Sequence, residues 1–143
     1  MRLALKEQLA NQIAKQPDHP YVGWYAQQIS IDGSSSDAIT LLDSCLAQNS
    51  THQDALLVYG IIKAELDELD AAKEKLLELI AIEPRSFEAL NILMMISLKQ
   101  GAISRTRELY GLMTTIDPWF KVEIPDSNQT EGQVEPEEQA NNA

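Results

Sequence analysis

The stretch from Gln53 to Ser86 constrains the fold more than any other part of the chain. On each side of a short polar turn, apolar residues recur at steps of three and four, which places them on shared helix faces. The turn holds Asp67 and Glu68, polar residues that suit the start of a second helix. Pro84 cannot continue that helix and marks its end. The stretch therefore predicts two short helices joined by a tight turn.

The same pattern returns at a distance of 34 residues in both directions. Residues 87–120 keep apolar residues in phase, with Gly101 in the turn and Pro118 near the end. Residues 19–52 keep apolar residues in phase as well, with Gly33 in the turn. Three such copies are about the minimum for an independently stable array of repeats.

Two small residues allow the paired helices to approach closely, since Gly60 has no Cβ and Ala72 carries only a methyl group. Six residues stand where the tetratricopeptide repeat (TPR) signature has Trp, Leu, Gly, Ala, Phe and Pro: Leu56, Tyr59, Gly60, Ala72, Leu76 and Pro84. The stretch therefore resembles a TPR repeat. Lys63 departs from the signature, because that family has Tyr at this place.

The resemblance implies an all-α fold, a right-handed superhelix of helix hairpins with an extra N-terminal helix. The expected TPR-like domain covers 1–120, with the N-terminal helix at 2–16 and repeats at 19–52, 53–86 and 87–120. We expect seven helices, at about 2–16, 20–31, 35–49, 52–65, 68–82, 87–100 and 103–116. Thr51 is the expected N-cap of the fourth. The first helix is expected to cover the open end of the first repeat.

The charge balance narrows the range of partners. The chain has 22 acids and 11 bases, a net charge of −11, whereas contacts to nucleic-acid phosphates need clustered Lys and Arg. The chain contains no run of about 18 apolar residues, so no membrane span is predicted. The N-terminus lacks the pattern of a signal peptide. We therefore expect a soluble, cytoplasmic protein with no nucleic-acid partner and no membrane insertion.

The composition changes after Phe120. Residues 121–143 hold one base and six acids, a net charge of −5, and few apolar residues. Such a segment buries too little apolar surface to offset its chain entropy. We predict a disordered acidic tail at 121–143.

No catalytic, cofactor-binding or metal-binding constellation is visible. Cys45 is expected to pack in the core, and His19 and His52 to be solvent-exposed loop residues. The many carboxylates of residues 67–78 suit a solvated helix face better than an acid–base pair. We expect neither an enzyme nor a cofactor.

The resemblance also implies a partner-binding groove along the first helix of each repeat. Its residues are expected to be Trp24, Gln27 and Ile31, then Leu57, Val58, Ile61 and Glu65, then Glu88, Asn91, Ile92, Met95 and Lys99. This set is largely apolar. The Lys, Asn and Arg residues of the carboxylate clamp found in some TPR proteins are missing, so an acidic C-terminal peptide is an unexpected ligand.

Tyr21 and Trp24 allow two interpretations, either partial burial against the N-terminal helix or an exposed aromatic anchor for a partner. For the whole chain, we expect a non-catalytic protein–protein interaction module, an adaptor, scaffold or chaperone-like protein that binds a protein or peptide. The alternative is a self-associating structural subunit, such as a homodimer. It is motivated by Leu109, Leu112 and Met113, which have no obvious capping helix after them.

Overall fold

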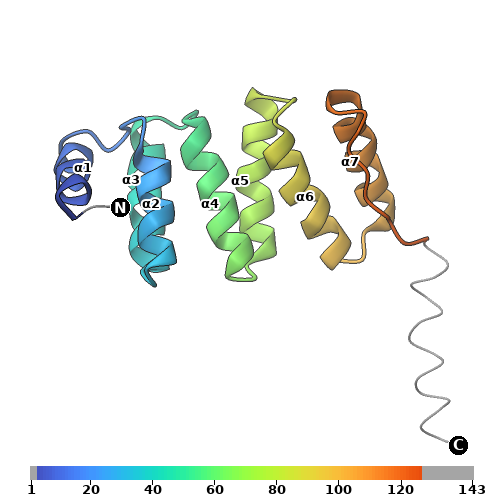
Figure 1. Ribbon diagram of the computed structural model, residues 1–143, viewed down its shortest axis with the longest axis horizontal. Coiled ribbons are helices and arrows are strands. Elements are labelled where there is room, and N and C mark those ends of the chain that lie inside the picture. The colour runs from blue at the N-terminus through green and yellow to red at the C-terminus, as the bar shows by residue number, and fades with distance from the viewer. Residues whose placement is uncertain (1–2, 127–143) are drawn as a thin grey trace, which may run out of the picture. The chain divides into compact units, whose positions relative to one another are not determined.

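The computed structural model describes residues 3–126, and within that range it contains seven helices and no strand. The helices are α1 (Leu3–Lys15), α2 (Val22–Ile31), α3 (Ser35–Gln48), α4 (Gln53–Glu65), α5 (Leu69–Ile82), α6 (Phe87–Lys99) and α7 (Ile103–Ile116) (Figure 1). The prediction of an all-α fold is confirmed for this range. The predicted tail falls largely on residues 127–143, which lie outside it.

Backbone contacts divide the chain into two compact units, Met1–Ala89 and Leu90–Ala143. The first unit contains α1 to α5, and α6 begins at its end. The second contains the rest of α6, then α7 and the segment that follows it. The boundaries of the three repeats remain predictions.

The turns within the three helix pairs share one backbone conformation. Gly33, Asp67 and Gly101 each have a positive φ, of 99°, 59° and 74°, and 34 residues separate each from the next. In the first turn, the amide N–H of Ser34 donates to the carbonyl of Ile29 at 2.9 Å, a bond that closes the end of α2. The equivalent bonds, from residue 68 to 63 and from 102 to 97, close α4 and α6. Glycine adopts this conformation without strain, and aspartate tolerates it better than most residues.

The core of the first unit is continuous from α1 to α4. Leu9 and Ile13 of α1 are buried against it, so the N-terminal helix belongs to the fold. The core cluster consists of Leu9, Ile13, Val22, Ala26, Ala38, Leu42, Cys45, Ala55, Val58 and Ile62. An exposed ion pair at 2.8 Å, between Lys6 and Asp32, links α1 to the turn after α2. The hydrogen bond between them raises the pKa of Lys6 and lowers that of Asp32.

Two glycines mark close approaches between helices of the first unit. A Cβ at Gly60 would lie 2.6 Å from Cγ and Cδ2 of Leu76, so α4 and α5 touch at this point. A Cβ at Gly23 would lie 3.0 Å from the carbonyl oxygen of Asp54, so the backbones of α2 and α4 also come close. The sequence indicates the first contact through its spacing. It gives no sign of the second.

The start of α4 differs from the prediction. The N-cap is His52, whose Nδ1 accepts a hydrogen bond from the amide of Ala55 at 3.2 Å, while Thr51 bonds to the side chain of Asn49. Nε2 of His52 also lies 3.2 Å from the carbonyl oxygen of His19. Both histidines lie between helices, as predicted, but they are half-buried, so the prediction that they are solvent-exposed is wrong. An imidazole can replace the usual short polar cap because its ring nitrogen accepts the same bond.

The helices of the second unit are joined by a buried polar contact. The hydroxyl oxygens of Ser97 in α6 and Thr106 in α7 lie 2.8 Å apart. Each is also bonded to a backbone carbonyl of its own helix, Ser97 to Met94 and Thr106 to Ala102. These bonds satisfy the buried hydroxyls, which explains why polar residues are tolerated here.

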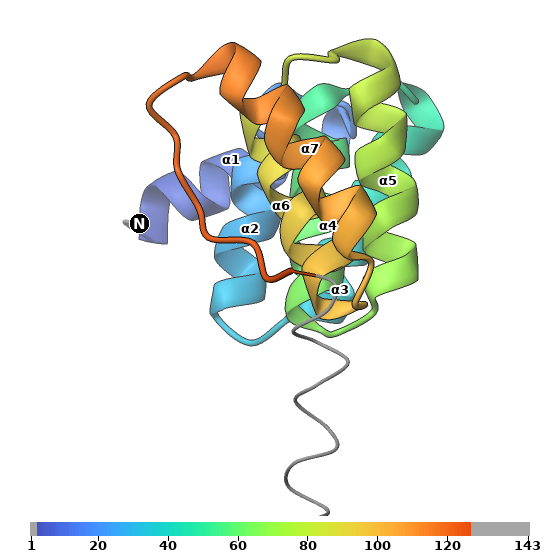
Figure 2. The ribbon, with the colours of Figure 1, turned by 90° about the vertical axis from the view of Figure 1, so that its right-hand side faces the viewer.

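The segment after α7 turns back and runs toward the start of that helix (Figures 1 and 2). Phe120 lies against Tyr110, with 6.0 Å between the ring centroids. Asp126 accepts a hydrogen bond of 2.7 Å from Arg107. The residues of the predicted tail that the structure describes, 121–126, thus include a charged contact with α7.

Candidate functional site

The predicted groove residues of α2 and α4 differ in how much surface they offer. Trp24 is 43% exposed and Ile31 is exposed, whereas Gln27 is half-buried. On α4, Leu57 and Ile61 are half-buried and Glu65 is exposed. Val58 is only 6% exposed and belongs mainly to the core.

The remaining predicted groove residues lie on α6. Glu88, which belongs to the first unit, is exposed. The others belong to the second unit, where Met95 is 56% exposed, Lys99 is exposed, and Asn91 and Ile92 are half-buried. Met95 is the large apolar residue of this group with the most accessible surface.

The structure brings four of the predicted residues together in a hollow between α2 and α4. Trp24, Gln27, Leu57 and Val58 line it, and its volume is about 230 Å³. Pro20, Tyr21 and Asp54 complete the lining. Four of the predicted groove residues thus share one hollow of the first unit, and their binding of a partner stays a prediction.

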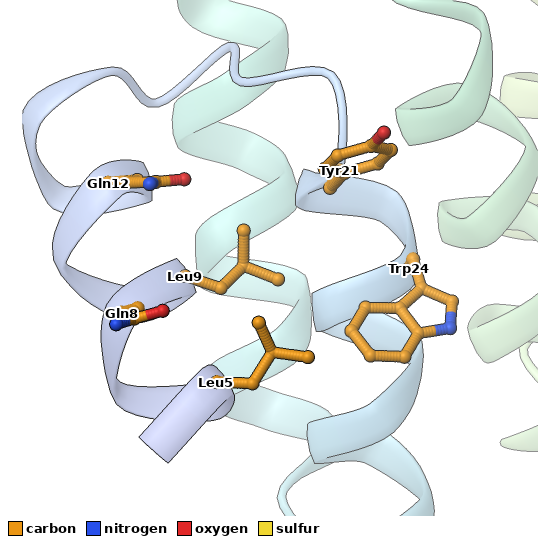
Figure 3. Close-up of a pocket in the computed structure, with 6 residues that line it drawn as sticks. All are labelled: Leu5, Gln8, Leu9, Gln12, Tyr21 and Trp24. Atoms are coloured by element: carbon orange, nitrogen blue, oxygen red, sulfur yellow. The ribbon is translucent and has the colours of Figure 1, made fainter. Parts of the chain in front are cut away.

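A larger hollow of about 480 Å³ lies between α1 and α2 (Figure 3). Its lining consists of Leu5, Gln8, Leu9, Gln12, Tyr21 and Trp24. In Figure 3, Leu5 and Leu9 point from α1 toward α2, and the six-membered ring of Trp24 points back toward Leu5. The side chains of Gln8 and Gln12 lie one helical turn apart along α1. This volume is in the range of pockets that hold ligands.

Tyr21 and Trp24 line both hollows, so the two depressions meet at this aromatic pair. Tyr21 is 64% exposed, and the α1 side of the larger hollow includes Leu5, which is 53% exposed. A helix that is anchored by Leu9 and Ile13 thus leaves the next leucine of its apolar stripe largely uncovered. Trp24 packs beside α1 and is therefore partly buried, but it still exposes 43% of its surface. The role of the pair as an anchor for a partner stays a prediction.

Few of the residues that line the two hollows carry a charge. Among the described residues that line them, Asp54 is the single acidic group, and none is Lys or Arg. Asp54 lies in the first turn of α4 and is exposed. The site is therefore an apolar and aromatic surface with amide groups along one side and a carboxylate at the other.

The sequence misses most of the larger hollow. In the sequence, Leu5 looks like part of the covered side of a capping helix, and Gln8 and Gln12 look like part of its solvent-facing side. Asp54 looks like an ordinary acidic residue in the first turn of a helix. The sequence feature that could have indicated this hollow is a leucine on the apolar side of the first helix, Leu5, together with the aromatic residues Tyr21 and Trp24 at the start of the second. Sequence alone does not reveal which turn of α1 lies next to Trp24.

Cys45 is buried in the core, where desolvation raises the pKa of its thiol to about 11 and the charge of Asp18 adds to the effect. A thiol in that state is a poor nucleophile at neutral pH. Within residues 3–126, no group of three His, Cys, Asp or Glu side chains is placed to hold a metal ion. The helices of this range are also too short or too polar to cross a bilayer.

No protein-family model matches the sequence, and no curated protein is significantly similar to it.

Proposed function

We propose that this chain is a non-catalytic protein–protein interaction module of TPR-like architecture, which binds a segment of a partner protein. Three features support the architecture: the matching turns at 34-residue spacing, the contact of Gly60 with Leu76, and the burial of Ala72. The right-handed superhelix is the arrangement that such helix hairpins adopt in the TPR family.

The observation that carries the binding role is the exposed aromatic pair between two hollows. Aromatic residues, tryptophan and tyrosine above all, are enriched at the energetic centres of protein interfaces. They bury a large area at a low entropic cost, because each has only two side-chain torsions. A partner residue in either hollow can contact Trp24, because Trp24 lines both.

The test is selection of random displayed peptides on the immobilised protein, followed by measurement of the affinity of the selected peptides. Trp24→Ala should weaken binding by roughly tenfold or more, since truncation of a hot-spot aromatic costs about 2 kcal/mol. Trp119→Ala is the matched control, because Trp119 is exposed and lies in the other unit. Both variants should keep the circular-dichroism spectrum of the wild type. Failure to enrich any peptide on the wild type contradicts the proposal.

Met95→Asp tests whether binding extends along the predicted groove to α6. A loss of affinity in this variant assigns Met95 to the same surface as Trp24. Unchanged affinity limits the binding surface to the first unit.

The alternative, a self-associating subunit, has a narrower basis in the structure. Of the three residues that motivated it, Leu109 and Met113 are buried, and Leu112 is exposed. Sedimentation over a range of concentrations distinguishes the two functions. A mass that rises with concentration and returns to that of a monomer in Leu112→Glu supports self-association.

A further inference from the structure

We infer that the two hollows form one composite site for an extended peptide that carries a large apolar residue close to a Lys or Arg. The apolar side chain occupies the hollow between α1 and α2, and the basic side chain reaches Asp54 beside the hollow between α2 and α4. This inference rests on the proposed function and specifies its ligand. It also places the main anchoring pocket on α1, outside the groove expected from the sequence.

The lining of the larger hollow favours an apolar side chain. Leu5, Leu9 and Trp24 supply its walls, and Leu5 keeps more than half of its surface exposed. Covering this surface removes apolar area from water, the main favourable term in association. The volume of about 480 Å³ is large enough for the side chain of Phe, Leu, Met or Trp.

The two glutamines favour a peptide backbone over a compact apolar molecule. Gln8 and Gln12 are four residues apart on α1 and line the same hollow, so their side chains emerge about 5–6 Å from each other. In an extended peptide, the backbone groups that face one side recur about every 6.6 Å. A side-chain amide both donates and accepts hydrogen bonds, as the peptide group does. The spacing and the chemistry therefore suit an extended segment that lies along α1.

Charge complementarity is the reason to expect a Lys or Arg in the peptide. The carboxylate of Asp54 is the one charged group among the described residues that line the hollows, and the chain as a whole has a net charge of −11. A cationic partner segment is steered toward such a surface, and an acidic one is repelled. Since Tyr21 and Trp24 line both hollows, one short peptide can reach both, with its basic residue close in sequence to the apolar one.

The experiment uses the same random displayed peptides, selected in parallel on the wild type and on two variants of exposed residues. Peptides from the wild type should be enriched in a large apolar residue close to a Lys or Arg. Leu5→Gln should lower their affinity by about tenfold, the effect of losing one buried apolar contact. Asp54→Asn should lower it by about three- to fivefold, as expected for an exposed ion pair, and should reduce its dependence on salt.

Matched controls are available for both variants. Leu77→Gln changes an exposed leucine on α5, and Asp37→Asn changes an exposed aspartate in the first turn of α3. Neither residue lines a hollow, so both controls should bind as the wild type does. Gln12→Met provides a further variant of α1, because it removes the amide and keeps the length of the side chain. It should also weaken binding.

The outcomes separate the inference from the proposed function. If no peptide is enriched on the wild type, the proposed function fails. If peptides bind in a manner that depends on Trp24 but is unchanged in Leu5→Gln, Gln12→Met and Asp54→Asn, the function stands and the composite site is overturned. If sedimentation shows an oligomer that Leu5→Gln dissociates, a second copy of the chain occupies the hollow, and the inference is also overturned.

Discussion

The α4–α5 and α6–α7 hairpins join their helices by different means around a similar turn. In the first, Gly60 lets Leu76 approach the backbone of α4, and the contact is apolar. In the second, Ser97 and Thr106 meet through a buried hydrogen bond of 2.8 Å. Asp67 in one turn and Gly101 in the other both have a positive φ. The two hairpins thus share the turn conformation, whereas the contacts that fill their interiors differ.

The difference also shows where each hairpin is sensitive to change. A contact made by the absence of a side chain tolerates no added atom, because the interior is close-packed. A contact between two buried hydroxyl groups is sensitive to a change in volume and even more to a change in polarity. If one hydroxyl is removed, the other stays buried without that hydrogen-bond partner. Four substitutions or conditions test this comparison.

The largest effect is expected for Gly60→Leu. A Cβ at this position already lies 2.6 Å from Cγ of Leu76, and three further carbons must displace α5. We expect a loss of about 1–3 kcal/mol in the free energy of unfolding, measured by chemical denaturation. An unchanged denaturation midpoint contradicts the contact between α4 and α5.

Thr106→Val should cost about 1 kcal/mol, because it removes one hydroxyl of the buried pair and leaves Ser97 bonded to Met94 alone. The double variant Ser97→Ala with Thr106→Val completes a double-mutant cycle. Its loss should be smaller than the sum of the two single losses. Additive losses indicate that the two hydroxyls do not stabilise the hairpin as a pair.

Gly111→Ala should act in the opposite direction from any substitution at Gly60. A Cβ at Gly111 meets no atom within 4 Å, and the residue lies in the interior of α7. Alanine should therefore stabilise the protein by about 0.5–1 kcal/mol through its higher helix propensity. A lower melting temperature in this variant contradicts the open surface at this point of α7.

The smallest effect is expected for the pH dependence of stability that Cys45 contributes. Positions 79 and 113, at the same place in the later hairpins, hold the buried residues Leu79 and Met113. Burial raises the pKa of the Cys45 thiol from 9.0 to about 11. The folded state therefore keeps its proton over a range in which the unfolded chain loses it. Stability from this group is fully present below pH 9 and decreases as the pH rises from 9 toward 11. Cys45→Ala should reduce this part of the pH dependence in denaturation measurements.

The helical organisation could be predicted closely, because it depends on local signals. Apolar spacing, Pro84 and the turn residues place all seven helices with ends within two residues of those observed. Gly60 could also be assigned to a close contact, since a glycine inside a helical pattern needs a packing reason.

Contacts between residues far apart in the sequence could not be predicted in the same way. The cap of α4 depends on the ring of His52, which also meets the carbonyl oxygen of His19. The larger hollow depends on which turn of α1 lies opposite Trp24, and the periodicity of α1 does not contain that information. Four of the predicted groove residues meet in one hollow, but the sequence does not predict the larger hollow around Leu5.

Gly23 affects how the specificity of the proposed site can change during evolution. Its missing Cβ sets the separation of α2 from the first turn of α4, where an added carbon would lie 3.0 Å from the carbonyl oxygen of Asp54. The neighbouring residue is Trp24, which lines one hollow together with Asp54, so this separation helps to set the width of that hollow. We expect Gly23→Ala to widen this hollow slightly without altering any residue that lines it. A single methyl group can therefore retune the spacing that the site selects in its partner, and specificity can drift while the lining stays the same.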